Sequence, residues 1–290
     1  ELVEILLQDY DSETVDRILG SSYEMRPTSI RVNTDRISVD EFERKLEAAG
    51  IETVRGSLND TSLLIKGYDY VRRIPGFMDG EFVVQDQSSC LAVKAAGIQE
   101  GDLVVDVCAA PGGKTMYAAS LAGQTGRVIS RDLTENKTEL IEENVDRLGL
   151  TNVTVEAWDA RELDENLVGK ADVVIADLPC SGLGIMGRKN DIKYNVTGDS
   201  IDELAQLQRD ILDTVSGYVR PGGTLVYSTC TIDSRENQNN VKWFVENHDF
   251  ETVSIDEIVP GRGGDKGFVT LLQGVDECDG FFISKFVRTK

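Results

Sequence analysis

The sequence predicts an α/β protein in which a doubly wound parallel sheet follows a small α+β unit. Two observations predict this fold class. From Gly101 onward, short apolar runs alternate with segments of helical length, which is the pattern of a parallel sheet covered by helices. Before about residue 80, strand and helix signals are mixed without that regular alternation. We therefore expect two domains, at residues 1–80 and 81–290.

The first domain is expected to hold three helices and two strands. Two short amphipathic helices fill residues 1–20, and Ser12 is a candidate N-cap of the second. Residues 38–41 read Ser-Val-Asp-Glu, the pattern of a capping box, so a third helix begins there and ends at Gly50. Strands are expected at Ser29–Asn33 and Leu63–Lys66.

The second domain is expected to alternate strands and helices along its length. The expected strands are Leu103–Val107, Arg127–Arg131, Val153–Val155, Asp172–Ala176 and Thr224–Ser228. The expected helices are residues 114–122, 134–148 (closed by Gly149), 202–219 and 234–247. In such a sheet, ligands bind beyond the carboxyl ends of the strands. Reactive side chains follow these strands at Cys108, Asp132, Asp159, Asp177, Cys180 and Cys230, which predicts a functional site at this edge.

Composition excludes several classes of protein. The 290 residues are 40% hydrophobic and 28% charged, an ordinary globular balance, and no apolar run is long enough to span a membrane. The five cysteines form no C-x-x-C pair and there is a single histidine, so we expect no metal site. We expect free thiols, a cytoplasmic location and a monomer.

The net charge of −21 opposes binding to a polyanion, because RNA-binding proteins normally carry a basic surface. One interpretation is a high-salt cytoplasm, since the Debye length falls to ~3 Å at 1 M salt and repulsion is then screened. The other is an acidic surface with a local basic groove. The sequence leaves both open.

A Gly-rich loop, Asp106–Thr115, connects the first expected strand of the sheet to a helix. It reads Asp-Val-Cys-Ala-Ala-Pro-Gly-Gly-Lys-Thr, which is neither G-x-G-x-x-G nor a P-loop. Its glycines let the backbone approach a ligand, and the acids at nearby strand ends suit a cofactor without phosphates. Asp132 is placed for ribose hydroxyls and Asp159 for an adenine amine. The candidate cofactor-binding residues are Cys108, Ala109, Ala110, Pro111, Gly112, Gly113, Lys114, Asp132, Lys137, Asp159 and Asp177.

Several motifs resemble those of the NOL1/NOP2/Sun family of RNA cytosine-5 methyltransferases. They are Asp106–Thr115, Asp177-Leu-Pro-Cys-Ser-Gly182 and Tyr227-Ser-Thr-Cys-Thr231, with Gln85–Ser89, Gly187–Lys193 and Asp279–Ile283. The resemblance spans about residues 25–290. It implies a Rossmann-like methyltransferase core, S-adenosyl-L-methionine as cofactor and rRNA or tRNA as substrate. It also implies that the small N-terminal α+β domain contacts RNA.

Two cysteines are candidates for a covalent role. Carbon 5 of cytosine accepts a methyl group only after a thiolate has added to carbon 6, which is nucleophilic catalysis. Cys230 and Cys180 both follow expected strands, so position does not rank them. DNA cytosine methyltransferases attack from a Pro-Cys, which favours Cys180. The family resembled uses the Thr-Cys cysteine and lets the Pro-Cys one aid release, which favours Cys230 as the nucleophile.

Other side chains receive roles by position or through the resemblance. Asp177 is expected to bind the amine or ring nitrogen 3 of cytosine, and the resemblance implies that Lys114 pairs with it and joins the catalytic set. Trp158 is a candidate to flank adenine. The expected RNA contacts are Arg188, Lys189, Lys193, Arg26 and Arg31, with Arg72 and Arg73 as further candidates. Cys90 and the Cys108 side chain are assigned to packing, and Phe281 and Phe282 to the core.

Three other functions compete with cytosine methylation, and one of them, a thiol redox protein, is disfavoured by the absence of a C-x-x-C pair. An amino-group methyltransferase would carry Asp-Pro-Pro-aromatic where this chain has Asp-Leu-Pro-Cys. A non-catalytic ribosome-assembly factor would keep the fold and bind rRNA without needing reactive thiols. The presence of Cys230, Cys180 and Asp177 together favours an enzyme.

Overall fold

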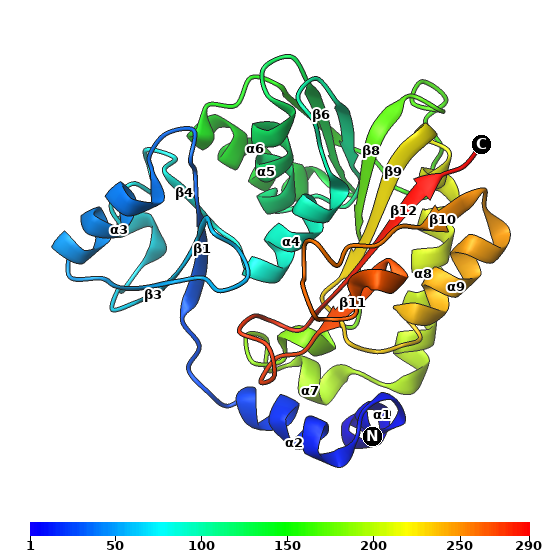
Figure 1. The fold of residues 1–290 in the computed structure, drawn as a ribbon, viewed down its shortest axis with the longest axis horizontal. Coiled ribbons are helices and arrows are strands. Elements are labelled where there is room, and N and C mark those ends of the chain that lie inside the picture. The colour runs from blue at the N-terminus through cyan, green and yellow to red at the C-terminus, as the bar shows by residue number, and fades with distance from the viewer.

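The computed structural model describes residues 1–290 and contains two β-sheets (Figure 1). The smaller sheet is antiparallel, in the order β2-β3-β1-β4. Its strands are β1 (Thr28–Val32), β2 (Glu52–Arg55), β3 (Ser62–Lys66) and β4 (Phe82–Val84). Because β4 pairs with β1, this sheet extends past residue 80. The division of the chain into residues 1–80 and 81–290 stays a prediction.

One helix, α3 (Val39–Ala48), covers the small sheet. The predicted capping box is confirmed, since the Ser38 side chain accepts from the Glu41 N–H and the Glu41 carboxylate accepts from the Ser38 N–H. Phe42 and Leu46 on this helix are fully buried against the sheet. Burial of each side chain stabilises the unit by roughly 1.5–3 kcal/mol.

The larger sheet has eight strands, in the order β10-β12-β9-β8-β5-β6-β7 with β11 beside β12. The strands are β5 (Leu103–Asp106), β6 (Arg127–Asp132), β7 (Val153–Ala157), β8 (Ala171–Asp177), β9 (Val219–Thr229), β10 (Phe250–Thr252), β11 (Phe268–Leu271) and β12 (Phe281–Arg288). From β7 to β9 the pairing is parallel, which confirms the five predicted strands and the fold class. The antiparallel strands β10, β11 and β12 were not predicted.

Helices cover both faces of the large sheet (Figure 1). One face carries α4 (Gln87–Ala96), α5 (Gly113–Ala122) and α6 (Glu135–Leu148), and the other carries α8 (Gly198–Ser216) and α9 (Gln238–Asn247). Adjacent residues of β5 enter opposite cores, with Val104 facing α4 and α5 and Val105 facing α8. The helix α8 begins four residues before its predicted start because Thr197 caps it through the Ser200 N–H.

The first two helices, α1 (Leu2–Asp9) and α2 (Ser12–Ser21), pack on the large unit beside α7 (Ile192–Asn195) rather than on the small sheet (Figure 1). Leu6 lies in one apolar cluster with Ile232, whose carbonyl accepts a hydrogen bond from the Tyr10 hydroxyl at 2.7 Å. The N-cap of α2 is Asp11, which corrects the expectation of Ser12. Short 3₁₀ turns lie at Val71–Arg73, Leu183–Ile185 and Gly264–Lys266.

Arg147 of α6 connects the small sheet to the large unit. Its Nη1 donates to the carbonyls of Phe77 (2.8 Å) and Phe82 (3.0 Å), and its guanidinium lies 4.2 Å from the centre of the Phe77 ring. Nearby, Arg36 of the small unit donates to the Leu148 carbonyl at 2.6 Å. These bonds fix the small sheet against one end of α6.

We predict that Arg147→Ala lowers the free energy of unfolding by about 2 kcal/mol, because two carbonyls lose a charged donor. Urea denaturation followed by circular dichroism measures the change. Arg44→Ala is the matched control: it removes an exposed arginine that bonds only to a carbonyl of its own helix, so the change should stay within about 0.5 kcal/mol. Equal losses in both variants would show that Arg147 does not connect the two units.

Candidate active site

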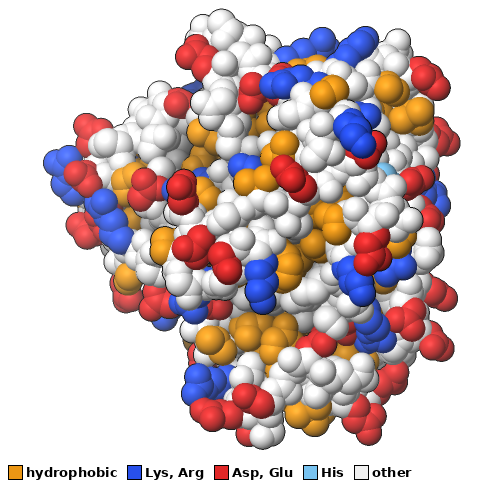
Figure 2. Space-filling model, turned by 45° about the vertical axis from the view of Figure 1, so that its right-hand side comes forward, with side chains coloured by type: hydrophobic (Ala, Val, Ile, Leu, Met, Phe, Trp, Pro, Cys, Tyr) orange, Lys and Arg blue, Asp and Glu red, His pale blue; other side chains and the backbone are white.

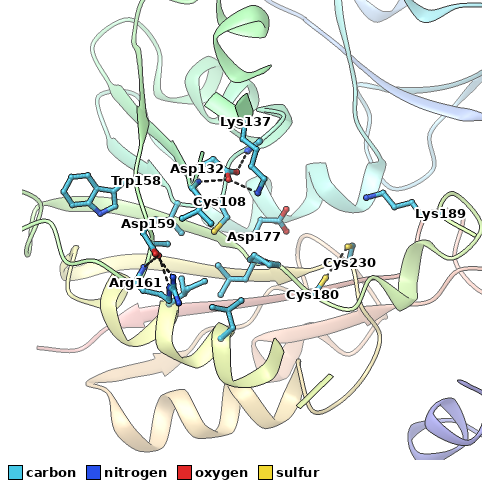
Figure 3. Close-up of a pocket in the computed structure, with 18 residues that line it drawn as sticks. Cys108, Asp132, Lys137, Trp158, Asp159, Arg161, Asp177, Cys180, Lys189 and Cys230 are labelled. Carbon is cyan, nitrogen blue, oxygen red and sulfur yellow. Dashed lines mark hydrogen bonds and ion pairs between the residues drawn. The ribbon is translucent and has the colours of Figure 1, made fainter. Parts of the chain in front are cut away.

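A cleft of about 470 Å³ opens at the carboxyl edge of the large sheet (Figure 3). All six reactive side chains predicted at strand ends line it, namely Cys108, Asp132, Asp159, Asp177, Cys180 and Cys230. An adjoining cavity of about 210 Å³ shares Cys108, Ala110 and Asp177 and is also lined by Ala109, Pro111, Gly113 and Lys114. The order of strands reverses between β5 and β8, and open α/β sheets bind ligands at such a point.

The loop at residues 108–113 is held against the end of β6 by Asp132. This carboxylate is buried and accepts from the Ala110 N–H (2.9 Å), the Leu133 N–H (2.8 Å) and Lys137 Nζ (2.9 Å). Gly112 has a φ of +103°, a conformation that side chains disfavour, and a Cβ there would lie 2.9 Å from Met116 Cε. Only glycine therefore lets the loop follow this path.

The far end of the cleft is walled by Trp158 and an ion pair (Figure 3). The Trp158 ring packs 4.5 Å from the Arg131 guanidinium, and its Nε1 donates to the Glu162 carbonyl at 2.8 Å. Asp159 is already bound by Arg161, through Nε (3.0 Å) and Nη2 (2.6 Å), and this hydrogen bonding lowers its pKa. Arg161 was not predicted, because nothing in the sequence distinguishes it from a solvated arginine.

Lys114 and Asp177 form an ion pair of 2.6 Å in the middle of the site. Burial alone would lower the pKa of Lys114, but the attraction and hydrogen bond of Asp177 outweigh it, so the net pKa is raised and the side chain stays charged. The other oxygen of Asp177 accepts from the Ser228 hydroxyl at 2.7 Å. Ser228 was not predicted either. The pair implied for Lys114 and Asp177 is thus present in the structure.

The two cysteines that follow β8 and β9 meet in the cleft, with 3.3 Å between Cys180 Sγ and Cys230 Sγ (Figure 3). Both are partly exposed to the cleft. The hydrogen bond from Cys230, together with burial, raises the pKa of the Cys180 thiol. The pKa of Cys108 is also raised, by burial first, which fits a packing role for its side chain. Cys90 and Cys278 are buried away from these thiols.

Two segments of the chain cross closely beside the turn that contains Cys230, and backbone hydrogen bonds hold this turn in place. The Gly184 N–H donates to the Cys230 carbonyl at 2.9 Å, and the Gly280 N–H donates to the Gly184 carbonyl at 2.8 Å. A Cβ on Gly184 would lie 2.0 Å from the Gly280 oxygen, so the two segments approach this closely only because both residues are glycine. Phe281 and Phe282 beyond the crossing are buried in the core, as predicted.

Asp106 ends β5 beneath this site and is fully buried. One carboxylate oxygen accepts from the Thr115 hydroxyl at 2.7 Å, whereas the other has no hydrogen-bond partner. Burial raises its pKa to about 7, against the opposing effects of Thr115 and Lys114. The carboxyl is therefore poised to be neutral in slightly acidic solution.

The predicted RNA contacts do not form one basic surface. Arg31 is buried, donates to the Gln85 side chain at 2.8 Å and stacks on Tyr117, which corrects the expectation that it contacts RNA. Arg26 and Arg188 both pair with the buried Asp279.

The remaining cations lie at the surface. Lys193 lies 4.2 Å above the Tyr23 ring. Lys189 is exposed at the end of the cleft opposite Trp158 (Figure 3). Arg72 and Arg73 are at the surface of the small unit.

On the face drawn in Figure 2, acidic side chains are spread over the outline and basic ones form small separate groups. None of the helices combines the length and the hydropathy that a bilayer-spanning segment requires. No group of three histidine, cysteine or acidic side chains is arranged to hold a metal ion.

The strand order and a cleft lined by acids and thiols at the switch point define a Rossmann-like methyltransferase. The family model described as 16S rRNA methyltransferase RsmB/F matches residues 94–287, and its companion model for a ferredoxin-like domain matches residues 2–71. The chain belongs to this RsmB/F family, which confirms the resemblance found in its motifs.

Individual relatives agree with this assignment. A probable ribosomal RNA small subunit methyltransferase B of Bacillus subtilis is 37% identical over 94% of this chain, and a ribosomal RNA small subunit methyltransferase B of Vibrio cholerae is 35% identical over 97%. The crystal structure of PH0851 superposes with a TM-score of 0.93 at 31% identity, over 98% of this chain and 65% of that one. The chain spans 62% and 63% of the lengths of the two curated relatives.

Asp106 makes stability depend on pH. Its pKa of about 7 in the folded chain exceeds the ~3.9 of an unfolded aspartate, so the folded state binds the additional proton and stability falls as pH rises from about 4 to 7. Asp106→Asn keeps an acceptor for Thr115 and cannot ionise. Relative to this variant, we predict that the wild type loses about 2–3 kcal/mol of unfolding free energy between pH 5 and 8.

Urea denaturation at each pH measures this difference, with the exposed Asp69→Asn as the control that should follow the wild-type curve. Parallel curves for the wild type and Asp106→Asn would mean that Asp106 is ionised across the whole range.

Proposed function

We propose that this chain methylates carbon 5 of cytosine in small-subunit ribosomal RNA, with S-adenosyl-L-methionine as methyl donor. The observation that carries the proposal is the pair of thiols, Cys180 and Cys230, 3.3 Å apart beside Asp177 in the cleft. A packing role explains neither thiol, because both are open to the cleft. The same pair disfavours an assembly factor without catalytic activity.

The residues of the cleft fit S-adenosyl-L-methionine. Asp132 Oδ2 accepts one hydrogen bond, from the Ala110 N–H, so it can still accept another from a ribose hydroxyl. Trp158, Leu207 and Ile211 give apolar surface for an adenine ring, and the loop at 108–113 exposes backbone to the adjoining cavity. When bound there, the cofactor would supply the methyl group that carbon 5 accepts. An adenine amine would share Asp159 with Arg161.

Cys230 is assigned as the nucleophile. Its thiolate adds to carbon 6 of cytosine, forming the S–C6 bond and moving the C5–C6 electron pair toward carbon 5. Its turn is held by the crossing at Gly184, so the sulfur is presented from a fixed backbone. A fixed geometry of this kind lowers the activation barrier because the reacting groups lose little orientational freedom on reaching the transition state.

Asp177 is assigned to bind the amine edge of cytosine. Its two oxygens are held by Lys114 and Ser228, so its orientation is set before the substrate arrives. Negative charge that develops on the ring during thiolate addition lies next to the charged Lys114. Preorganised groups of this kind make the largest single contribution to many enzymatic rates.

Cys180 is assigned to the release step. After methylation, a base must take the proton from carbon 5. The electron pair of that C–H bond then re-forms the C5–C6 double bond, and the S–C6 bond breaks to release the Cys230 thiolate. Cys180 is suitably placed because its sulfur is 3.3 Å from that of Cys230.

RNA is proposed to reach the cleft past Lys189, with Lys193, Arg188 and Arg26 near its entrance. Because Arg26 and Arg188 are paired with Asp279, few of these cations are free for phosphates. A site that depends on few phosphate contacts is compatible with the net charge of −21. A cytoplasmic location is part of the proposal, since the five cysteines are free thiols, and the expected monomer stays a prediction.

Cofactor binding is the first test. We predict that Asp132→Asn weakens S-adenosyl-L-methionine binding by about tenfold to a hundredfold, because the amide carries one charge and one acceptor fewer. Isothermal titration calorimetry measures the affinity. Asp146→Asn, an exposed substitution on α6, should leave it unchanged. Tight binding of a nicotinamide dinucleotide instead would refute the cofactor assignment.

The second test separates the two thiols. Cys230→Ser should form no covalent RNA adduct and transfer no methyl group, because a serine hydroxyl is barely ionised near neutral pH. Cys180→Ser should still attack and methylate but fail to release, so a protein–RNA band should survive denaturing electrophoresis. The double variant should lose that band. If the band instead appears in Cys230→Ser and is absent from Cys180→Ser, the roles are reversed; full activity in both variants would exclude covalent catalysis.

A further inference from the structure

One buried carboxylate reaches the turn that follows Cys180. Glu236 lies between β9 and α9 and is fully buried. Its Oε2 accepts from the Ser181 N–H at 3.0 Å and from Gln208 Nε2 at 2.8 Å, and its Oε1 accepts from the Ser181 hydroxyl at 2.5 Å. Ser181 is the residue after Cys180, so Glu236 binds the Cys180 turn through both its backbone and its side chain.

The same group is connected to the turn that carries Cys230. The Ser181 hydroxyl lies 2.8 Å from the hydroxyl of Thr231, which directly follows Cys230. The neighbouring Asn237 accepts from the Thr229 hydroxyl (2.7 Å) and donates to the Thr231 carbonyl (3.0 Å). The residues on both sides of Cys230 are therefore bound by Glu236 and Asn237, directly or through Ser181.

A carboxylate is an unusual choice for this position. No lysine or arginine lies within ion-pair distance of Glu236, and burial raises its pKa. An unpaired carboxylate is costly to bury, yet it offers only acceptors, and three donors converge on it here. Glutamine has nearly the same shape, but its side-chain NH2 group would replace one of the two acceptor oxygens and would face a donor.

We propose that Glu236 is a positioning residue that sets the separation and orientation of the thiols of Cys180 and Cys230. It acts by binding the turn after Cys180 directly and the turn after Cys230 through Ser181, and it touches neither sulfur. For its effect on catalysis, the inference rests on the proposed function. Its effect on the two thiols is independent of the proposed function, because the thiols meet in the protein without RNA or cofactor.

Proximity of the thiols is measured by how readily they form a disulfide in glutathione buffers. Two thiols give two electrons and two protons to oxidised glutathione, which yields one intramolecular disulfide and two molecules of reduced glutathione. We expect Glu236→Gln to lower this equilibrium constant at least about tenfold, or about 30 mV in potential. At pH 7 an ordinary thiol is still mostly protonated, so the lost charge of Glu236 acts little through thiol ionisation. Mass spectrometry identifies the bond between Cys180 and Cys230.

Three variants separate positioning from general damage to the fold. Asp276→Asn alters another buried carboxylate, one that pairs with Arg262 and accepts from the Leu272 N–H but makes no hydrogen bond to either cysteine turn, and it should leave the equilibrium constant unchanged. Ser181→Ala removes the hydroxyl bridge but keeps the backbone bond to Glu236, so its effect should be intermediate. Cys180→Ser abolishes the signal.

The kinetic test follows from the same geometry. Displacement of reacting groups by about 1 Å can cost a hundredfold in rate, so Glu236→Gln should lower kcat by about that factor while the affinity for S-adenosyl-L-methionine stays within about twofold. An unchanged thiol equilibrium would overturn the proposal, whatever the kinetics. So would a variant in which melting temperature, cofactor affinity and thiol equilibrium all fall together. A changed thiol equilibrium in a protein that never methylates RNA would retain the positioning and reject the proposed function.

Discussion

The parallel pairing of β8 with β5 on one side and β9 on the other is the constraint on which the site depends. Parallel strands end at the same edge, so Asp106, Asp177 and Cys230 meet although more than fifty residues separate each from the next. The loop after β8 then needs only three residues to bring Cys180 beside Cys230. The parallel pairing of β6 and β7 beside β5 brings Asp132 and Asp159 to the same edge.

The strands were predictable because their physics is local. Buried parallel strands appear as short apolar runs, and the residue that ends each run is the one that faces a ligand. Helix caps were predictable for the same reason where the motif is complete, as at Ser38. The placement of Lys114 beside Asp177 followed from family resemblance, since nothing in the sequence alone brings the amine of α5 to the end of β8.

What could not be predicted depends on distant partners or on full burial. The helix α4 buries eight of its ten residues, so it has no polar face and no amphipathic period to detect. Arg31 looks like a surface cation in the sequence, but its partner Gln85 lies 54 positions away. Arg26 and Arg188 likewise pair with Asp279, which lies 253 and 91 positions away from them. The hydrogen bonds of Glu236 have the same character, because Ser181 and Gln208 are invisible to local patterns.

The packing of α1 and α2 on the large unit has a consequence for biosynthesis. The Tyr10 hydroxyl bonds to a carbonyl 222 residues later, and the Asp9 carboxylate bonds to the Ser234 N–H across 225 residues. A ribosome that adds about 5–20 residues per second needs roughly 10–45 s to cover that distance. Until residues 183–201 have been made, the apolar faces of both helices have no native surface to cover them, and the contact with Ile232 comes later still. The nascent chain therefore passes through a period in which the apolar faces of α1 and α2 are open to chaperones that bind exposed hydrophobic segments.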